Sequence, residues 1–240
     1  MKRLVILASV WAFAWGAAVD AQRGGRGGAP PVSPRQAAPI DHAGYWVSVV
    51  AEDWKYRMVT PKKGVFDGVP LNPEGRKAGE SWDPARDEAA GEQCRSYGGG
   101  AIMRVPGRLN IAWQDDSTLK IDTDAGTQTR LFRFGPSSAP AEATWQGHSV
   151  AQWNIPGRSL KVVTTNLRAG YVRKNGVPYS NQATVTEYWD LNVFPNGDRW
   201  LTVTTELVDP VYFTRPYVTS SDFKKLPSAA GWNPTPCSVR

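Results

Sequence analysis

Short segments in which apolar and polar residues alternate recur along the chain after residue 100, with turn residues between them. A period of two places successive side chains on opposite faces of a β-strand. Asp115-Asp116-Ser117 and Asn196-Gly197-Asp198 have the composition of tight hairpin turns. With one earlier strand, nine are expected, at 45–50, 101–105, 108–114, 118–123, 127–134, 144–154, 159–167, 182–193 and 199–208. Many strands with short connections are typical of an antiparallel sandwich or an up-and-down barrel.

The segment between residues 64 and 100 has a different pattern. Asn72-Pro73 and Asp83-Pro84 each combine a helix N-cap residue with a proline at the first helical position. The residues after Asp83 favour a short helix that ends at Gly98 and carries Cys94. We therefore expect short helices around residues 72–97, inserted into a domain that is otherwise β.

The first 21 residues have the three parts of a secretory signal peptide. Lys2 and Arg3 give a positive start, an uncharged apolar run follows, and small residues end it. The alternative is a membrane anchor. An anchor needs roughly 20 apolar residues, and this apolar run is shorter. Residues 22–40 are rich in Gly, Pro, Ala and Arg, and we expect them to be a disordered linker. The expected product is a single domain over 41–240, periplasmic or secreted, with no integral membrane segment after cleavage.

The pI of 9.4 is not, on its own, an indication of a nucleic-acid partner. Five of the 28 Lys and Arg residues precede Asp41, and the expected domain keeps 23 against 21 acidic residues. A nucleic-acid-binding protein needs a clustered basic face. We therefore expect no nucleic-acid partner.

Two cysteines, Cys94 and Cys237, are present. An even number of cysteines with a long spacing in an exported protein indicates a disulfide. Two unpaired thiols are the alternative. No C-x-x-C pair that would indicate redox catalysis occurs in the sequence.

Glu187 is the most unusual residue of the 182–193 segment. It shares its face with apolar residues, among them Val185 and Trp189. An ionised carboxylate on an apolar face is costly unless it is paired, and such groups cluster at functional sites. Glu187 is therefore either a functional group or one half of a structural ion pair with an arginine.

His148 is one of only two histidines and lies within the 144–154 segment. Histidine is the side chain best suited to proton transfer near neutral pH. His148 is therefore a candidate for catalysis or ligand contact, with a hydrogen-bonded structural role as the alternative. So few histidines, without a cluster of Cys, Asp and Glu, predict no metal site. We expect no cofactor either, and no G-x-S-x-G motif is present.

Tryptophan is abundant, with eleven residues in the chain. The set that strand alternation places toward the core is Trp46, Trp113, Trp145, Trp153 and Trp189. These side chains predict either a large aromatic core or a ring-lined cavity for an apolar or aromatic ligand.

Two resemblances extend this interpretation. Gly44-Tyr45-Trp46 resembles the G-x-W motif that opens lipocalin-type barrels. The region from about Asp124 to Thr219 is similar to a group of exported bacterial proteins of unassigned function. Its four shared motifs are here Trp145-Gln-Gly-His148-Ser-Val-Ala-Gln-Trp153, Gly176-Val-Pro-Tyr179-Ser180, Thr186-Glu187-Tyr188 and Asp209-Pro-Val-Tyr-Phe-Thr-Arg-Pro216.

The chain departs from the motifs of that group at two positions. Tyr179 stands where the group has a second histidine, and Tyr188 stands where it has an arginine after the glutamate. If that arginine neutralises the glutamate, another residue must do so here, and Arg130 or Arg173 are candidates. A tyrosine hydroxyl at position 179 could still donate or relay a proton.

These patterns together predict a mainly β protein, an antiparallel up-and-down lipocalin-like β-barrel with short helices inserted around residues 72–97. The expected function is binding of a small apolar or aromatic molecule, with Trp46, Trp113, Arg130, Trp145, Trp153 and Trp189 as the ligand-binding residues. The alternative is a cofactor-independent lyase, isomerase or hydratase. In that case Glu187 and His148 act as acid and base and Tyr179 as proton donor, which requires all three to converge on one cavity.

Overall fold

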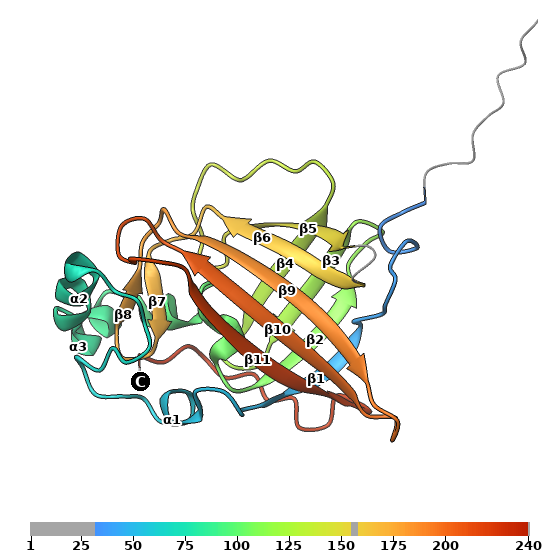
Figure 1. Cartoon of the computed structure of the whole chain (residues 1–240), viewed down its shortest axis with the longest axis horizontal. Helices are drawn as coiled ribbons and strands as arrows, with labels where there is room; N and C mark the ends of the chain where they lie inside the picture. The colour runs from blue at the N-terminus through green and yellow to red at the C-terminus, as the bar shows by residue number, and fades with distance from the viewer. Residues whose placement is uncertain (1–31, 155–157, 240) are drawn as a thin grey trace, which may run out of the picture. The chain divides into compact units, whose positions relative to one another are not determined.

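The computed structural model describes residues 32–154 and 158–239. The expected signal peptide and residues 22–31 of the expected linker lie outside these ranges. Residues from Val32 onward belong to one compact unit. Most of its regular structure is β, with a few short helices (Figure 1).

Nine of the eleven strands in the described residues close into a barrel, in the order β1-β11-β10-β9-β6-β5-β4-β3-β2 (Figure 1). Their bounds are β1 Gly44–Val49, β2 Arg108–Trp113, β3 Thr118–Thr123, β4 Gln128–Phe134, β5 His148–Asn154, β6 Ser159–Thr165, β9 Thr184–Val193, β10 Arg199–Val208 and β11 Tyr217–Leu226. The other two, β7 (Gly170–Arg173) and β8 (Val177–Tyr179), form a separate two-stranded sheet. Since chain neighbours are mostly sheet neighbours, the expected barrel topology is largely present.

One strand pair of the barrel is parallel, so the prediction of a purely antiparallel barrel is wrong. β4 and β5 run in the same direction, with Phe132 opposite Ser149 and Phe134 opposite Ala151. Parallel neighbours need a crossover connection of about a dozen residues or more, and residues 135–147 provide one. The barrel is therefore mixed.

Eight of the nine expected strands are present, but the one at 101–105 is not a strand. Ile102–Arg104 form a 3₁₀ helix, η2, whose Ile102 and Met103 side chains join the barrel core. The sequence also failed to indicate β7, β8 and β11. On β11 the buried face includes Thr219 and Ser221, so the residues that point inward are not reliably apolar.

The helices lie between β1 and β2, and α2 and α3 begin where the N-cap patterns predict them, whereas α1 was not predicted. They are α1 Trp54–Arg57, α2 Pro73–Glu80, α3 Pro84–Ala89 and the 3₁₀ helix η1 Gln93–Tyr97. The Asn72 side chain accepts a hydrogen bond from the Gly75 amide at 2.8 Å, and Asp83 caps α3 in the same way. Cys94 lies on η1 rather than on a continuation of α3, because Gly91, with φ of 70°, ends that helix in the left-handed region.

Two layers of buried side chains fill the molecule. The first is the barrel interior, where Trp46, Phe132 and Trp189 are fully buried. The second lies between the helices, the β7–β8 hairpin and the adjacent barrel end, and it contains Leu167 and Tyr179. Figure 1 shows the helices and this hairpin at one end of the barrel.

Residues 32–40, the last part of the expected linker, lie against the opposite end of the barrel (Figure 1). The Trp153 indole Nε1 donates a hydrogen bond to the Pro34 carbonyl at 2.9 Å. The Arg35 amide donates to the Asp116 carbonyl at 3.1 Å. These contacts hold this part of the expected linker at the barrel end.

Cys94 and Cys237 form a disulfide, which confirms the predicted pair. The bond joins η1 to the C-terminal segment across 143 residues of sequence. A disulfide is compatible with an extracytoplasmic location. Across residues 32–154 and 158–239, no helix is long and apolar enough to cross a membrane.

Candidate functional site

Glu187 lies inside the barrel, where it forms an ion pair with Arg130. The pair is bidentate: Arg130 Nη1 is 2.9 Å from Glu187 Oε1, and Arg130 Nη2 is 2.7 Å from Oε2. Both side chains are fully excluded from solvent. Arg130 on β4 therefore reaches across the interior to β9. Of the two candidate partners for Glu187, Arg130 is the one that binds it.

His148 lies on the other side of the barrel wall from Glu187. Its β5 neighbour Ser149 points inward and is hydrogen-bonded to Thr164, with 2.8 Å between the two hydroxyl oxygens. Adjacent strand residues face opposite sides, so the His148 side chain points outward. There its Nε2 lies 3.3 Å from the Ser137 carbonyl, within the connection that covers it.

Tyr179 is on β8, outside the barrel, and is also fully buried. Its hydroxyl lies beside the Gly100 amide but in a geometry that falls short of a full hydrogen bond. Burial raises the pKa of this hydroxyl, so it stays protonated. The three predicted catalytic residues thus occupy three separate environments: the barrel interior, its outer face and the second core layer.

The predicted ligand-binding tryptophans are also divided. Trp46 and Trp189 are fully buried in the barrel core, and Trp189 packs edge-to-face on Phe132 at 5.1 Å between ring centroids. Trp113 and Trp153 are only half-buried, at the barrel end that residues 32–40 contact. Trp145 precedes β5 and lies outside the interior, with the Arg168 guanidinium 3.9 Å above its ring.

An aromatic-lined cavity is present elsewhere, between the helices α2 and α3 and the β7–β8 hairpin. Its volume is about 220 Å³. Among its lining residues, four carry aromatic rings: Trp82, Tyr171, Tyr179 and Tyr212. Of the residues expected to form a site, Tyr179 is the one that lines this cavity.

One wall of the cavity carries a buried polar cluster around Asp87. The Asp87 carboxylate accepts hydrogen bonds from Arg95 Nη1 and from the Tyr171 hydroxyl, each at 2.8 Å. Burial, and then this bond to Asp87, raise the pKa of Tyr171. The Asp87 carboxylate is therefore paired and both tyrosines stay neutral. Asp83, Arg86 and Arg95 also line the cavity, so its wall combines aromatic rings with charged groups.

Close backbone packing positions the aromatic rings. A Cβ at Gly100 would lie 2.9 Å from the Tyr179 ring, and one at Gly170 would lie 2.6 Å from its hydroxyl. The ring thus fits only against glycine. Asp209 holds the end of β8, because its carboxylate accepts the Ser180 amide at 2.6 Å and the Ser180 hydroxyl at 2.8 Å.

Sequence reasoning missed Trp82, Tyr171 and Tyr212 as site residues. They lie outside the long alternating strands on which the search for core-facing aromatics was based. The Asp83-Pro84 signal next to Trp82 locates a helix start but not the surface against which the helix packs. Tyr212 does lie within the fourth shared motif, and that position is the one available hint.

No family model matches the chain, and no curated protein or solved structure is significantly similar to it. The fold and the cavity therefore define the class: a closed, mixed nine-stranded barrel, counted over the described residues, with a helical cap that holds an aromatic cavity. No group of three or more His, Cys, Asp or Glu side chains in those residues could hold a metal ion.

Proposed function

We propose that this protein binds a small aromatic molecule in the cavity between α2, α3 and the β7–β8 hairpin. The observation that carries the proposal is that four of the thirteen residues lining about 220 Å³ of space are aromatic. Cavities of ~150 Å³ lined by apolar side chains can hold benzene. The space here therefore suits one substituted ring, which would stack or pack edge-on against the lining rings.

Tyr179 supplies the polar contact in this proposal. Its hydroxyl has no hydrogen-bond partner among the described residues, and an unpaired buried hydroxyl is costly. The hydroxyl lies next to Gly170, which also lines the cavity. The hydroxyl oxygen itself has almost no accessible surface, so a ligand acceptor such as a phenol oxygen would reach it only after a small shift of the cavity wall. Tyr179 acts here as a hydrogen-bond donor rather than as a catalytic acid.

The barrel serves as scaffold in this proposal. In this proposal the barrel is closed, as a lipocalin barrel is, but the ligand does not bind inside it. Side chains around Trp46 and Trp189 fill the barrel interior. The proposed location is periplasmic or secreted. An exported binding protein of this kind needs no acid–base pair, which agrees with the engagement of Glu187 by Arg130.

The test uses phenol as the probe and protein NMR as the readout. We expect phenol at millimolar concentration to shift the Trp82 indole resonance, assigned with Trp82→Phe. Ala169 lines the cavity, and Ala169→Leu should remove the shift by filling the space. The matched control is Ala230→Leu at an exposed position, which should leave the shift unchanged.

Two results would contradict the proposal. The first is a phenol shift at Trp113 or Trp153 with none at Trp82, which would move the site to the opposite barrel end. The second is a Trp82 shift that survives Ala169→Leu. Cyclohexanol, the saturated counterpart of phenol, tests whether the cavity prefers aromatic ligands. Because only an aromatic ring can stack on the lining rings, we expect cyclohexanol to bind more weakly than phenol.

A further inference from the structure

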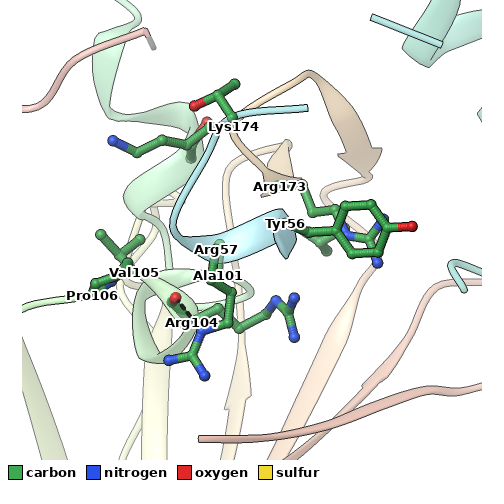
Figure 2. A pocket seen from close by; sticks show the side chains of 11 residues that line it. Tyr56, Arg57, Ala101, Arg104, Val105, Pro106, Arg173 and Lys174 are labelled. Atoms are coloured by element: carbon green, nitrogen blue, oxygen red, sulfur yellow. Dashed lines mark hydrogen bonds between the residues drawn. The ribbon is translucent and has the colours of Figure 1, made fainter. Parts of the chain in front are cut away.

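A second cavity lies where α1, η2 and the end of β7 meet, and four of its eleven lining residues are basic. Figure 2 shows Arg57 on α1, Arg104 on η2, and Arg173 and Lys174 at the end of β7 around it. No acidic residue lines this cavity. It shares no lining residue with the aromatic cavity, so the two sites are independent.

The guanidinium groups of this basic cavity are buried yet incompletely paired. Arg104 is 6% exposed and Arg173 is 4% exposed. Four of their nitrogens have no hydrogen-bond partner among the described residues: Arg57 Nη2, Arg104 Nη1, and Arg173 Nε and Nη1. Buried donors without a partner are rare in folded proteins, because each costs the free energy of its lost hydration.

The three arginines are held in fixed positions by their other contacts. Arg57 Nε donates to the Arg104 carbonyl at 2.8 Å, and Arg104 Nη2 donates to Asp53 at 2.9 Å (Figure 2 shows both arginines). The Arg173 guanidinium stacks on the Tyr56 ring at 4.3 Å. The unpaired donors are thus preorganised rather than free to turn toward solvent.

The local charge is unbalanced. Asp53 is the carboxylate that contacts the cluster, at 2.9 Å from Arg104 and 3.6 Å from Arg173. Burial, followed by the nearby charge of Arg104, lowers the pKa of Arg57 to about 10. Asp53, Glu52 and Asp222 offset part of the positive charge on Arg57, but burial and Arg104 outweigh them. An added anion would relieve the remaining repulsion.

We propose that this basic cavity is a binding site for an oxyanion group, a phosphate or a carboxylate. Arginine presents several N–H donors in a planar fork that matches such groups. The cavity volume is about 30 Å³, which is room for roughly two water-sized groups. This space holds about two oxygens of such a group, so the rest of the anion and any organic remainder of the ligand extend out of the cavity.

Isothermal titration calorimetry of the full chain at low ionic strength tests the site. The probes are inorganic phosphate, phenyl phosphate and acetate. Arg57→Gln removes a partly exposed donor, which limits the risk of misfolding, and circular dichroism verifies the fold. We expect this variant to weaken binding by roughly ten- to a hundredfold, the loss for a charged hydrogen bond. Arg199→Gln removes the same charge from an exposed position and should bind as the native chain does.

The three probes also separate the sources of the anion. Equal affinity for inorganic phosphate and phenyl phosphate assigns the site to the free ion. Tighter binding of phenyl phosphate assigns it to the headgroup of a larger molecule, and preference for acetate assigns it to carboxylates. The proposal is overturned if none of the probes binds, or if binding to the Arg57→Gln and native chains is equal.

Discussion

Glu187→Gln should strongly destabilise the protein, because it leaves the Arg130 charge buried without a counter-charge. Both side chains have no solvent exposure, and two hydrogen bonds of 2.9 and 2.7 Å join them. Removing one partner of such a pair costs about 3–5 kcal/mol. Glutamine keeps the size of glutamate and one acceptor, so we expect the lower end of that range, about 3 kcal/mol.

The paired replacement gives the opposite result. Arg130→Met combined with Glu187→Leu removes both charges and keeps an apolar volume beside Phe132, so its stability should be within about 1–2 kcal/mol of the native chain or above it. Asp190→Asn on the outer face of the same strand is the control. It should change stability by less than about 0.5 kcal/mol.

Urea unfolding at equilibrium, followed by far-UV circular dichroism, measures all three variants. A loss for Glu187→Gln below about 1 kcal/mol would show that water reaches the pair, against the burial reasoning. A double variant as unstable as the single one would show that the pair itself, rather than the isolated charge, determines the cost.

Three further predictions concern other buried groups. Replacing Cys94 and Cys237 with serine should cost up to about 5 kcal/mol in urea unfolding, because the bond closes a loop of 143 residues. Tyr179→Phe should leave stability unchanged or raise it by about 1 kcal/mol, since the hydroxyl has no full hydrogen bond, and it should weaken phenol binding. Burial lowers the pKa of His42 from 6.5 to about 4, so unfolding takes up a proton below pH 6.5. Stability should fall by about 3 kcal/mol between pH 6.5 and pH 4 from this group, and His42→Asn should flatten that part of the pH profile.

Each of these three predictions has a contradicting outcome. The reasoning from loop-closure entropy would be refuted if the serine variant had the same urea midpoint as the native chain. It would also be refuted if reductant left the midpoint of the native chain unchanged. A loss of more than about 1 kcal/mol for Tyr179→Phe would show that the Gly100 amide is a full partner. Parallel stability profiles for the native chain and His42→Asn over that pH range would show that His42 is hydrated.

The sequence alone determined the strands with a clear period of two. The segments at 108–114, 118–123 and 199–208 match β2, β3 and β10 within a residue. Local backbone geometry sets this period, so it is readable without knowledge of the partner strand. The helix starts at Asn72 and Asp83 are equally local, because an N-cap contacts residues only two or three positions ahead.

Local pattern failed where side chains distant in sequence decide the structure. Ile102 and Met103 form part of an apolar run, yet packing into the barrel core makes them a 3₁₀ helix. On β11 the inward positions include Thr219 and Ser221, which hides the alternation. The parallel pairing of β4 with β5 depends on the path of the connecting residues rather than on either strand.

The sequence by itself therefore determined the β class, the Cys94–Cys237 pair and the need for a partner at Glu187. The tertiary structure decided that this partner is Arg130, that Tyr179 borders an aromatic cavity and that Arg57, Arg104 and Arg173 face a common space. Periodicity records only which face of a strand a residue occupies. Which residues meet across that face depends on barrel closure and on the packing of the inserted helices, and these join segments far apart in the chain.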